Sequence, residues 1–127
     1  MTPRTVRVRI PPDTGYVPLL RTTVAGIAAR EAFTLEEVDD LRMAVEEAAV
    51  LLLRIGDEEP LDLEVTVTEG SLEATLSAAL SGGDRLDESS FSWMILSALA
   101  DKVSADHDSD GVRIILAKAR SSTHAND

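Results

Sequence analysis

The carboxylate of Glu47 is the side chain in this sequence that invites a chemical question. It lies within residues 41–56, which are rich in Leu, Met, Ala, Glu and Arg and contain no proline or interior glycine, so we expect a helix there. Met43, Glu47, Leu51 and Arg54 recur at steps of three and four residues and therefore share one helix face. That face presents a single carboxylate, with the apolar Leu51 one turn later.

Other arrangements of reactive side chains are weak. Asp106, His107 and Asp108 are metal-ligating types, but consecutive residues of a strand point to opposite faces, so we expect no shared metal ion. His124 lies in a polar C-terminal segment. The serines have no base-and-orienter arrangement of the kind that a hydrolase needs. Cysteine is absent, which excludes disulfides and thiolate sites.

The composition predicts one globular domain. The chain has 127 residues, of which 44% are apolar and only 3% aromatic, so its core must be built from Val, Leu, Ile and Ala. The net charge of −11 argues against binding to a nucleic-acid backbone, because the phosphates would be repelled. The same charge suits attraction to a basic protein partner, and it equally suits a solvated acidic surface.

The N-terminal segment carries three arginines, Arg4, Arg7 and Arg9, with no apolar run behind them, so we expect no signal peptide. No stretch is long and apolar enough to span a bilayer. We therefore expect a cytoplasmic protein without a membrane anchor.

Four segments alternate apolar and polar residues, the pattern of strands with one buried face. They are residues 5–10, 61–68, 72–78 and 111–118. Glu69 and Gly70 supply a turn between the second and the third, which predicts an antiparallel hairpin. The sequence does not decide whether residues 103–107 form a further short strand.

Three segments have the composition of helices. They are residues 16–33, residues 41–56 and a segment from Ser89 or Ser90 to Val103. Thr34 and Glu37 form a capping-box pattern upstream of the middle helix. That helix has one continuous apolar face, formed by Leu41, Ala44, Val45, Ala48, Leu52 and Ile55.

The element order predicts the fold class. Strands with one polar face need helices on their other face only, so we expect an α+β two-layer sandwich: a mixed, mostly antiparallel sheet with three helices on one face. The domain is expected to span residues 1–119, and residues 120–127 are expected to form a disordered polar tail.

The segment from Ala44 to Leu51, which reads AVEEAAVL, resembles the N-box helix of the RsbW-type anti-sigma factors. These are small members of the histidine-kinase-like ATPase superfamily, and their pattern is roughly A-V-S-E-A-x-x-N. The resemblance implies the histidine-kinase-like fold and makes Glu47 the counterpart of the general base for serine phosphorylation. Leu51 replaces the family's magnesium-binding Asn, and it has no ligand atom.

The other nucleotide-binding elements of this family are also altered. Ala78 stands near the expected position of the adenine-binding Asp, and Gly82 and Gly83 form either a remnant of the adenine loop or a plain turn. Ser90 and Ser92 replace the phosphate-loop glycines, as helix caps or as weak anion contacts. The resemblance therefore implies a degenerate nucleotide site. We expect no cofactor; ATP and magnesium would bind only if this altered site has kept its function.

The segment Ser90-Phe91-Ser92-Trp93, followed by LSALAD, resembles the actinobacterial anti-sigma-F proteins of the UsfX type. We interpret Phe91 and Trp93 as large core residues that close the place where nucleotide would sit.

The segment from Leu19 to Ala25 resembles the first helix of the same family. The resemblance implies that Arg21 belongs to the surface that partners contact, and we predict that its neighbours Leu20 and Thr22 contribute to partner binding. It also implies a homodimer formed through the first strand and the first helix.

Our functional hypothesis is an anti-sigma factor, a pseudokinase that sequesters an alternative sigma factor of the SigF or SigB type. An anti-anti-sigma factor of the STAS type would release it by partner switching in a stress response. One alternative is an active serine-protein kinase that phosphorylates the anti-anti-sigma factor with Glu47 as a base. A second alternative is a signalling interaction module that binds no sigma factor.

Overall fold

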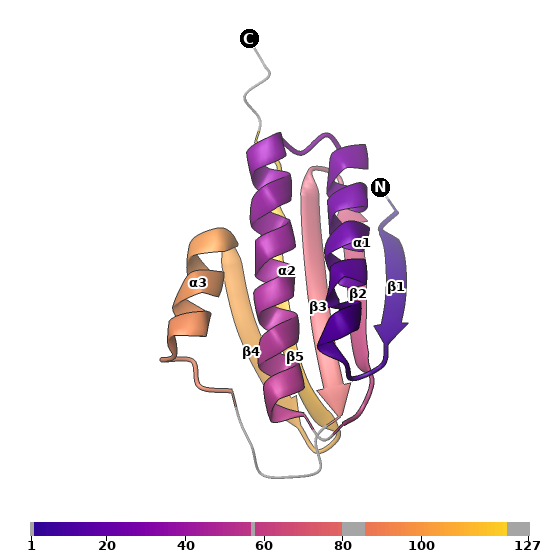
Figure 1. Cartoon of the computed structure of the whole chain (residues 1–127). Helices are drawn as coiled ribbons and strands as arrows, with labels where there is room; N and C mark the ends of the chain where they lie inside the picture. The colour runs from indigo at the N-terminus through magenta and orange to yellow at the C-terminus, as the bar shows by residue number, and fades with distance from the viewer. Residues whose placement is uncertain (1, 57, 80–85, 122–127) are drawn as a thin grey trace.

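The structure, a computed structural model of the whole chain, describes residues 2–56, 58–79 and 86–121. Three α-helices, one short 3-10 helix and five strands follow one another along these residues (Figure 1). In chain order they are β1 (Arg4–Ile10), η1 (Thr14–Tyr16), α1 (Val17–Arg30), α2 (Leu35–Ile55), β2 (Leu61–Thr68), β3 (Ser71–Ala79), α3 (Phe91–Leu99), β4 (Lys102–Asp108) and β5 (Gly111–Ala119).

The five strands form one sheet in the order β1-β2-β3-β5-β4. Every neighbouring pair is antiparallel, so the sheet contains no parallel pair among the described strands. The three α-helices lie on one face of this sheet (Figure 1). The predicted α+β two-layer sandwich is confirmed, with a sheet that is antiparallel throughout.

Helix α2 begins at the capping box that the sequence predicted. The Thr34 side chain accepts a hydrogen bond from the Glu37 backbone N–H at 3.1 Å, and the Glu37 carboxylate accepts one from the Thr34 N–H at 2.7 Å. Both bonds satisfy donors that the first turn of a helix would otherwise leave unpaired. The helix therefore starts six residues before Leu41, and it ends at Gly56 as expected.

A single apolar core fills the space between the helices and the sheet. Among the described residues no polar or charged residue is buried. The largest fully buried side chains are Ile10, Leu20, Leu41, Leu52, Leu61, Leu63, Leu72, Leu76, Leu96, Ile114, Leu116 and Val24. All of them are aliphatic, as the scarcity of aromatic residues predicted, and they supply most of the drive for folding.

The segment after α3 differs from the prediction. The helix ends at Leu99 rather than at Val103, and the short strand that was left open is the seven-residue β4. Val103 pairs with Leu116 and His107 with Val112, so pairing with the adjacent strand decides the conformation of this segment. Asp108 closes the connecting turn by accepting hydrogen bonds from the N–H groups of Asp110 and Gly111.

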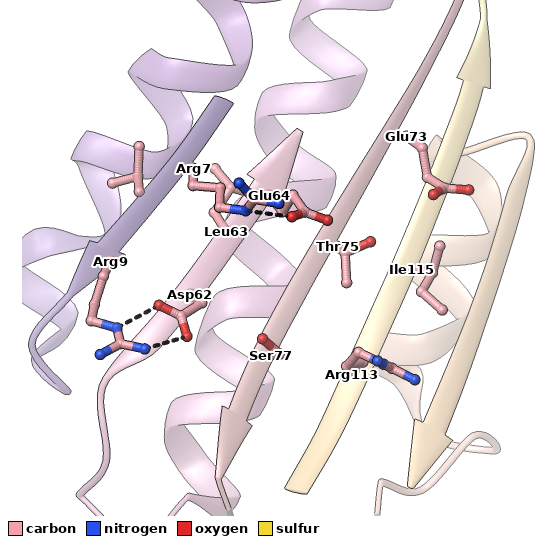
Figure 2. A pocket seen from close by; sticks show the side chains of 11 residues that line it. Arg7, Arg9, Asp62, Leu63, Glu64, Glu73, Thr75, Ser77, Arg113 and Ile115 are labelled. Atoms are coloured by element: carbon pink, nitrogen blue, oxygen red, sulfur yellow. Dashed lines mark hydrogen bonds and ion pairs between the residues drawn. The ribbon is translucent and has the colours of Figure 1, made fainter. Parts of the chain in front are cut away.

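The face of the sheet that the helices leave open carries paired charges. Arg7 bonds to Glu64 at 2.6 Å, and Arg9 makes two bonds to Asp62, at 2.7 and 3.1 Å (Figure 2). A hollow of about 720 Å³ lies over these strands. Alternation along each strand places these polar residues opposite the buried ones, as a half-covered sheet requires.

The C-terminal end of β5 is tied back to the domain. Arg120, expected in the polar tail, donates from its backbone N–H to the Gly70 carbonyl and from its guanidinium to the Glu31 carbonyl. The backbone N–H of Ser121 donates to Glu37. These two residues pack with the domain, and the remainder of the expected tail, 122–127, lies outside the described residues. None of the described helices has the length and apolar character needed to cross a lipid bilayer.

Lys118 of β5 joins three elements beneath the helices. Its side chain is only 11% exposed, and its ammonium group donates to the Leu99 carbonyl at 3.0 Å and lies 3.6 Å from the Asp40 carboxylate. Lys118→Met would leave both oxygens without this partner, so we expect the free energy of unfolding to fall by about 1–2 kcal/mol. Urea unfolding measures it.

Lys102→Met is the matched control, because Lys102 is exposed on β4 and its side chain forms no hydrogen bond or ion pair with any residue that the structure describes. Its expected effect is within about 0.5 kcal/mol. Equal losses for the two variants would contradict the structural role of Lys118.

Candidate functional site

Glu47 lies in the middle of α2 and is half-buried. Within the described part of the chain, no side chain donates a hydrogen bond to its carboxylate or forms an ion pair with it. Leu51, one turn later, is only 8% exposed and belongs to the core. Met43 and Leu51, predicted from their spacing to share one helix face, therefore differ in their surroundings: Met43 is 49% exposed, whereas Leu51 is buried.

The position assigned to the missing adenine contact is also apolar. Ala78 is 9% exposed in β3, and its neighbours across the sheet are Leu61 of β2 and Val112 of β5. Its side chain belongs to the same core as that of Leu51. Neither side chain has an atom that could hold magnesium or accept a hydrogen bond from adenine. Gly82 and Gly83 lie outside the described residues.

The N-terminus of α3 is capped by the protein itself. The Ser90 hydroxyl accepts a hydrogen bond from the Trp93 N–H at 3.1 Å, which occupies one donor that a phosphate would use. Ser92 is half-buried in the first turn. Hydrogen bonds from the hydroxyl and the backbone N–H of Ser89 lower the pKa of the Asp87 carboxyl. This ionised carboxylate, close before the helix, disfavours an anion there.

The two aromatic residues of α3 have different surroundings. Trp93 is 7% exposed and packs in the core, as expected, but Phe91 is 71% exposed. The interpretation of Phe91 as a core residue is therefore wrong. Two helical positions two residues apart lie roughly 200° apart around the axis, so one of the pair faces the sheet and the other faces away.

The acidic residues around His107 do not converge. Asp106 bonds to Arg113 at 2.8 Å on the open face, and the His107 ring accepts a hydrogen bond from the Leu86 N–H at 3.3 Å. Within residues 2–56, 58–79 and 86–121, no group of three or more His, Cys, Asp or Glu side chains is arranged to hold a metal ion.

A groove of about 670 Å³ separates the outer surfaces of α1 and α2. Its lining residues are Arg21, Thr22, Ala25, Gly26, Ala29, Val38, Arg42, Met43 and Glu46. Arg21 Nη1 of α1 bonds to Glu46 Oε1 of α2 at 2.9 Å, with the two side chains 40% and 44% exposed. Two of the three residues predicted to contact a partner, Arg21 and Thr22, thus lie in one concave surface.

Leu20, the third residue predicted to contact a partner, is fully buried. Its side chain packs in the core beneath α1 and holds the helix that presents Arg21 and Thr22. A direct contact by this side chain would require the helix to leave the sheet.

No pattern in the sequence marked Gly26, Arg42 and Glu46 as residues of this groove. Arg21 and Glu46 are 25 positions apart, so no helical spacing relates them. Only the packing of α1 against α2 brings them together. Glu47 rather than Glu46 was chosen as the candidate general base because Glu47 matches the family pattern, not because of a physical property of its side chain.

Comparison with known families assigns the fold. A profile of the family described as the histidine kinase-like ATPase domain matches residues 10–118. The match begins at the end of β1 and reaches β5, so it includes all three α-helices.

Two relatives illustrate the range of similar proteins. The anti-sigma-F factor RsbW of Mycobacterium tuberculosis is 35% identical over 106 residues, which are 83% of this chain and 63% of that protein. The serine-protein kinase RsbW of Bacillus subtilis is 30% identical over 83 residues, which are 65% of this chain and 52% of that protein. This chain thus spans less than two thirds of the length of either relative.

A solved structure has the same fold. The RsbU and RsbW domains of Rv1364c from Mycobacterium tuberculosis superpose with a TM-score of 0.74 at 11% identity, covering 92% of this chain and 32% of that one. The likeness shows that the three helices and the sheet are arranged in the same way.

Replacing the buried Leu51 tests whether its position can still serve a polar ligand. Leu51→Asn places an amide in the apolar core, so we expect the free energy of unfolding to fall by about 3 kcal/mol. Urea unfolding with and without magnesium and ATP measures both stability and ligand binding. Met43→Asn, on the exposed side of the same helix, should cost less than about 1 kcal/mol. A Leu51→Asn variant of full stability that magnesium and ATP stabilise further would contradict our assignment.

Proposed function

The chain belongs to the histidine kinase-like ATPase domain family, and we propose that it is an anti-sigma factor that acts by binding. In this proposal it sequesters an alternative sigma factor and keeps that factor from the polymerase core. An anti-anti-sigma factor of the STAS type then displaces the sigma factor. The complex forms in the cytoplasm, and binding requires no nucleotide.

The observation that carries this proposal is the apolar, buried character of Leu51 within a fold whose relatives include an anti-sigma-F factor. The similarity to that relative extends over 83% of this chain, at 35% identity. Phosphoryl transfer depends on metal ions and phosphate contacts, and the side chains at Leu51 and Ala78 supply neither. Binding to a protein partner depends on the outer surface, which the same core supports.

The groove between α1 and α2 supports Arg21 and Thr22 as contact residues. Both line a concave surface that contains two cationic side chains, Arg21 and Arg42, although the chain as a whole is acidic. A homodimer through β1 and α1 remains part of the proposal, because β1 is an edge strand whose outer hydrogen-bonding groups face no other described strand.

The alternative function is a serine-protein kinase, the activity named for the relative from Bacillus subtilis. The carboxylate of Glu47, half-buried and without a side-chain partner among the described residues, favours this alternative, because such a group is available to accept a proton. In that case Glu47 would activate a serine hydroxyl of the anti-anti-sigma factor.

Titration with sigma factors tests the main proposal. The alternative sigma factors of the source organism would be purified and titrated one by one into the chain. We expect one of them to bind, and Arg21→Glu to weaken that binding at least tenfold, or about 1.4 kcal/mol, because it reverses an exposed charge in the contact surface.

Arg54→Glu, an equal charge reversal at an exposed position of α2 outside the groove, is the control. It should change the affinity less than about twofold. Similar losses in both variants would show that overall charge, not the α1–α2 surface, determines binding. Capture of a different signalling protein with no sigma factor bound would favour the interaction-module alternative.

Calorimetry with magnesium and ATP separates the anti-sigma proposal from the kinase alternative. We expect no heat of binding at millimolar nucleotide, since the positions that would hold metal and adenine are apolar. Micromolar binding would support the kinase instead. Transfer of phosphate to an anti-anti-sigma factor should then disappear in Glu47→Gln.

A further inference from the structure

Arg21 is held by a weak contact within the molecule. Within the part of the chain that the structure describes, its guanidinium makes a single hydrogen bond, from Nη1 to Glu46 Oε1 at 2.9 Å, and both side chains are about two-fifths exposed. Arg9 on the open face provides a comparison, because its guanidinium donates two hydrogen bonds to the Asp62 carboxylate, at 2.7 and 3.1 Å. A planar guanidinium binds a carboxylate best in this two-bond arrangement. Arg21 therefore retains capacity for a better partner than Glu46.

The groove beside this ion pair has room for an incoming chain. The side of α1 that lines the groove carries small residues, Ala25, Gly26 and Ala29, which project little from the helix. A Cβ atom built onto Gly26 would meet nothing within 4 Å, so no contact inside the molecule requires glycine at this position. A glycine inside a helix lowers helix stability. Its presence here leaves open space along the groove.

The charge of the groove differs from that of the chain. The chain carries a net charge of −11, whereas the groove is lined by two arginines, Arg21 and Arg42, and by one carboxylate, Glu46. This lining is complementary to an acidic segment of a partner. Of the described residues that line the groove, Glu46 alone carries a charge that would repel such a segment.

We propose that Glu46 is an internal competitor for Arg21: it occupies the guanidinium in the free protein and must be displaced by a carboxylate of the sigma factor. This inference rests on the proposed function and deepens it. The affinity for the sigma factor is then set by the difference between two contacts of Arg21. The Glu46 contact is single and solvent-exposed, so it is readily exchanged.

The test measures sigma-factor affinity in a set of variants. Glu46→Gln removes the competing charge, so binding should tighten about two- to fivefold, the range expected for release of an exposed ion pair. Arg21→Gln should weaken binding at least tenfold. In the Arg21→Gln background, Glu46→Gln should bring no further gain, because the residue for which Glu46 competes is gone.

Glu73→Gln is the control for overall charge. Glu73 is exposed on the opposite face of the molecule, over the open side of the sheet (Figure 2). Its loss removes the same charge, and we expect no change in affinity. An equal gain from Glu73→Gln and Glu46→Gln would overturn the proposal, since the effect would then be long-range attraction.

A steric variant tests the groove independently of charge. Gly26→Leu adds a side chain into open space on α1, so the thermal midpoint should stay the same or rise, while sigma binding should weaken at least tenfold. Full affinity in this stable variant would overturn the assignment of the groove.

The outcomes distinguish this inference from the proposed function. Binding that is insensitive to Arg21→Gln and Glu46→Gln would leave the anti-sigma proposal standing and overturn the competitor role. Binding by Glu46→Gln but not by the wild type would support the competitor and overturn sequestration by the unmodified chain. Absence of binding in the wild type and in Glu46→Gln would overturn both.

Discussion

The apolar inner face of α2 must be buried against a sheet that helices cover on one side only. Because of this constraint, the charged side chains of the described residues lie outside the core. The core between them contains aliphatic side chains and no buried polar residue among those described. Among the described residues, ion pairs lie on the open face of the sheet and on the outer surface of α1 and α2. Lys118, only 11% exposed beneath the helices, is paired there with Asp40. Leu51 lies on the buried side of this division, whereas Arg21 and Glu46 lie on the exposed side.

This division separates the two activities that the fold can support. Catalysis on a nucleotide needs polar ligands within the protein. The two positions that the family resemblance assigns to such ligands hold the apolar side chains of Leu51 and Ala78. Binding to a protein needs only an outer surface of suitable shape and charge, and the packing of the same core supplies it. The apolar side chains of Leu51 and Ala78 therefore stabilise the domain without affecting the outer surface of α1, which we propose contacts partners. Glu47 persists between these regions as a half-buried carboxylate with no partner in the described part of the chain.

Local patterns in the sequence predicted local structure well. The capping box of Thr34 and Glu37 and the alternation of β2 and β3 depend on residues close in sequence, and both are confirmed. The end of α3 and the full length of β4 depend on pairing with β5, so the helical composition of residues 100–103 was misleading. To predict that Phe91 is exposed, one would need to know how α3 is oriented on the sheet. To predict the Arg21–Glu46 pair, one would need to know how α1 packs against α2. Periodicity within one segment contains neither kind of information.

The central claim is that this chain sequesters a sigma factor away from core polymerase by binding alone, and a competition experiment tests it most directly. Core polymerase is loaded with the fluorescently labelled sigma factor in a buffer free of nucleotide and magnesium, and the chain is then titrated in. We predict stoichiometric displacement of the labelled factor, measured as a fall in fluorescence anisotropy, that is unchanged on addition of magnesium and ATP. Displacement that occurs only after magnesium and ATP are added would contradict the claim and would show that the nucleotide site is functional.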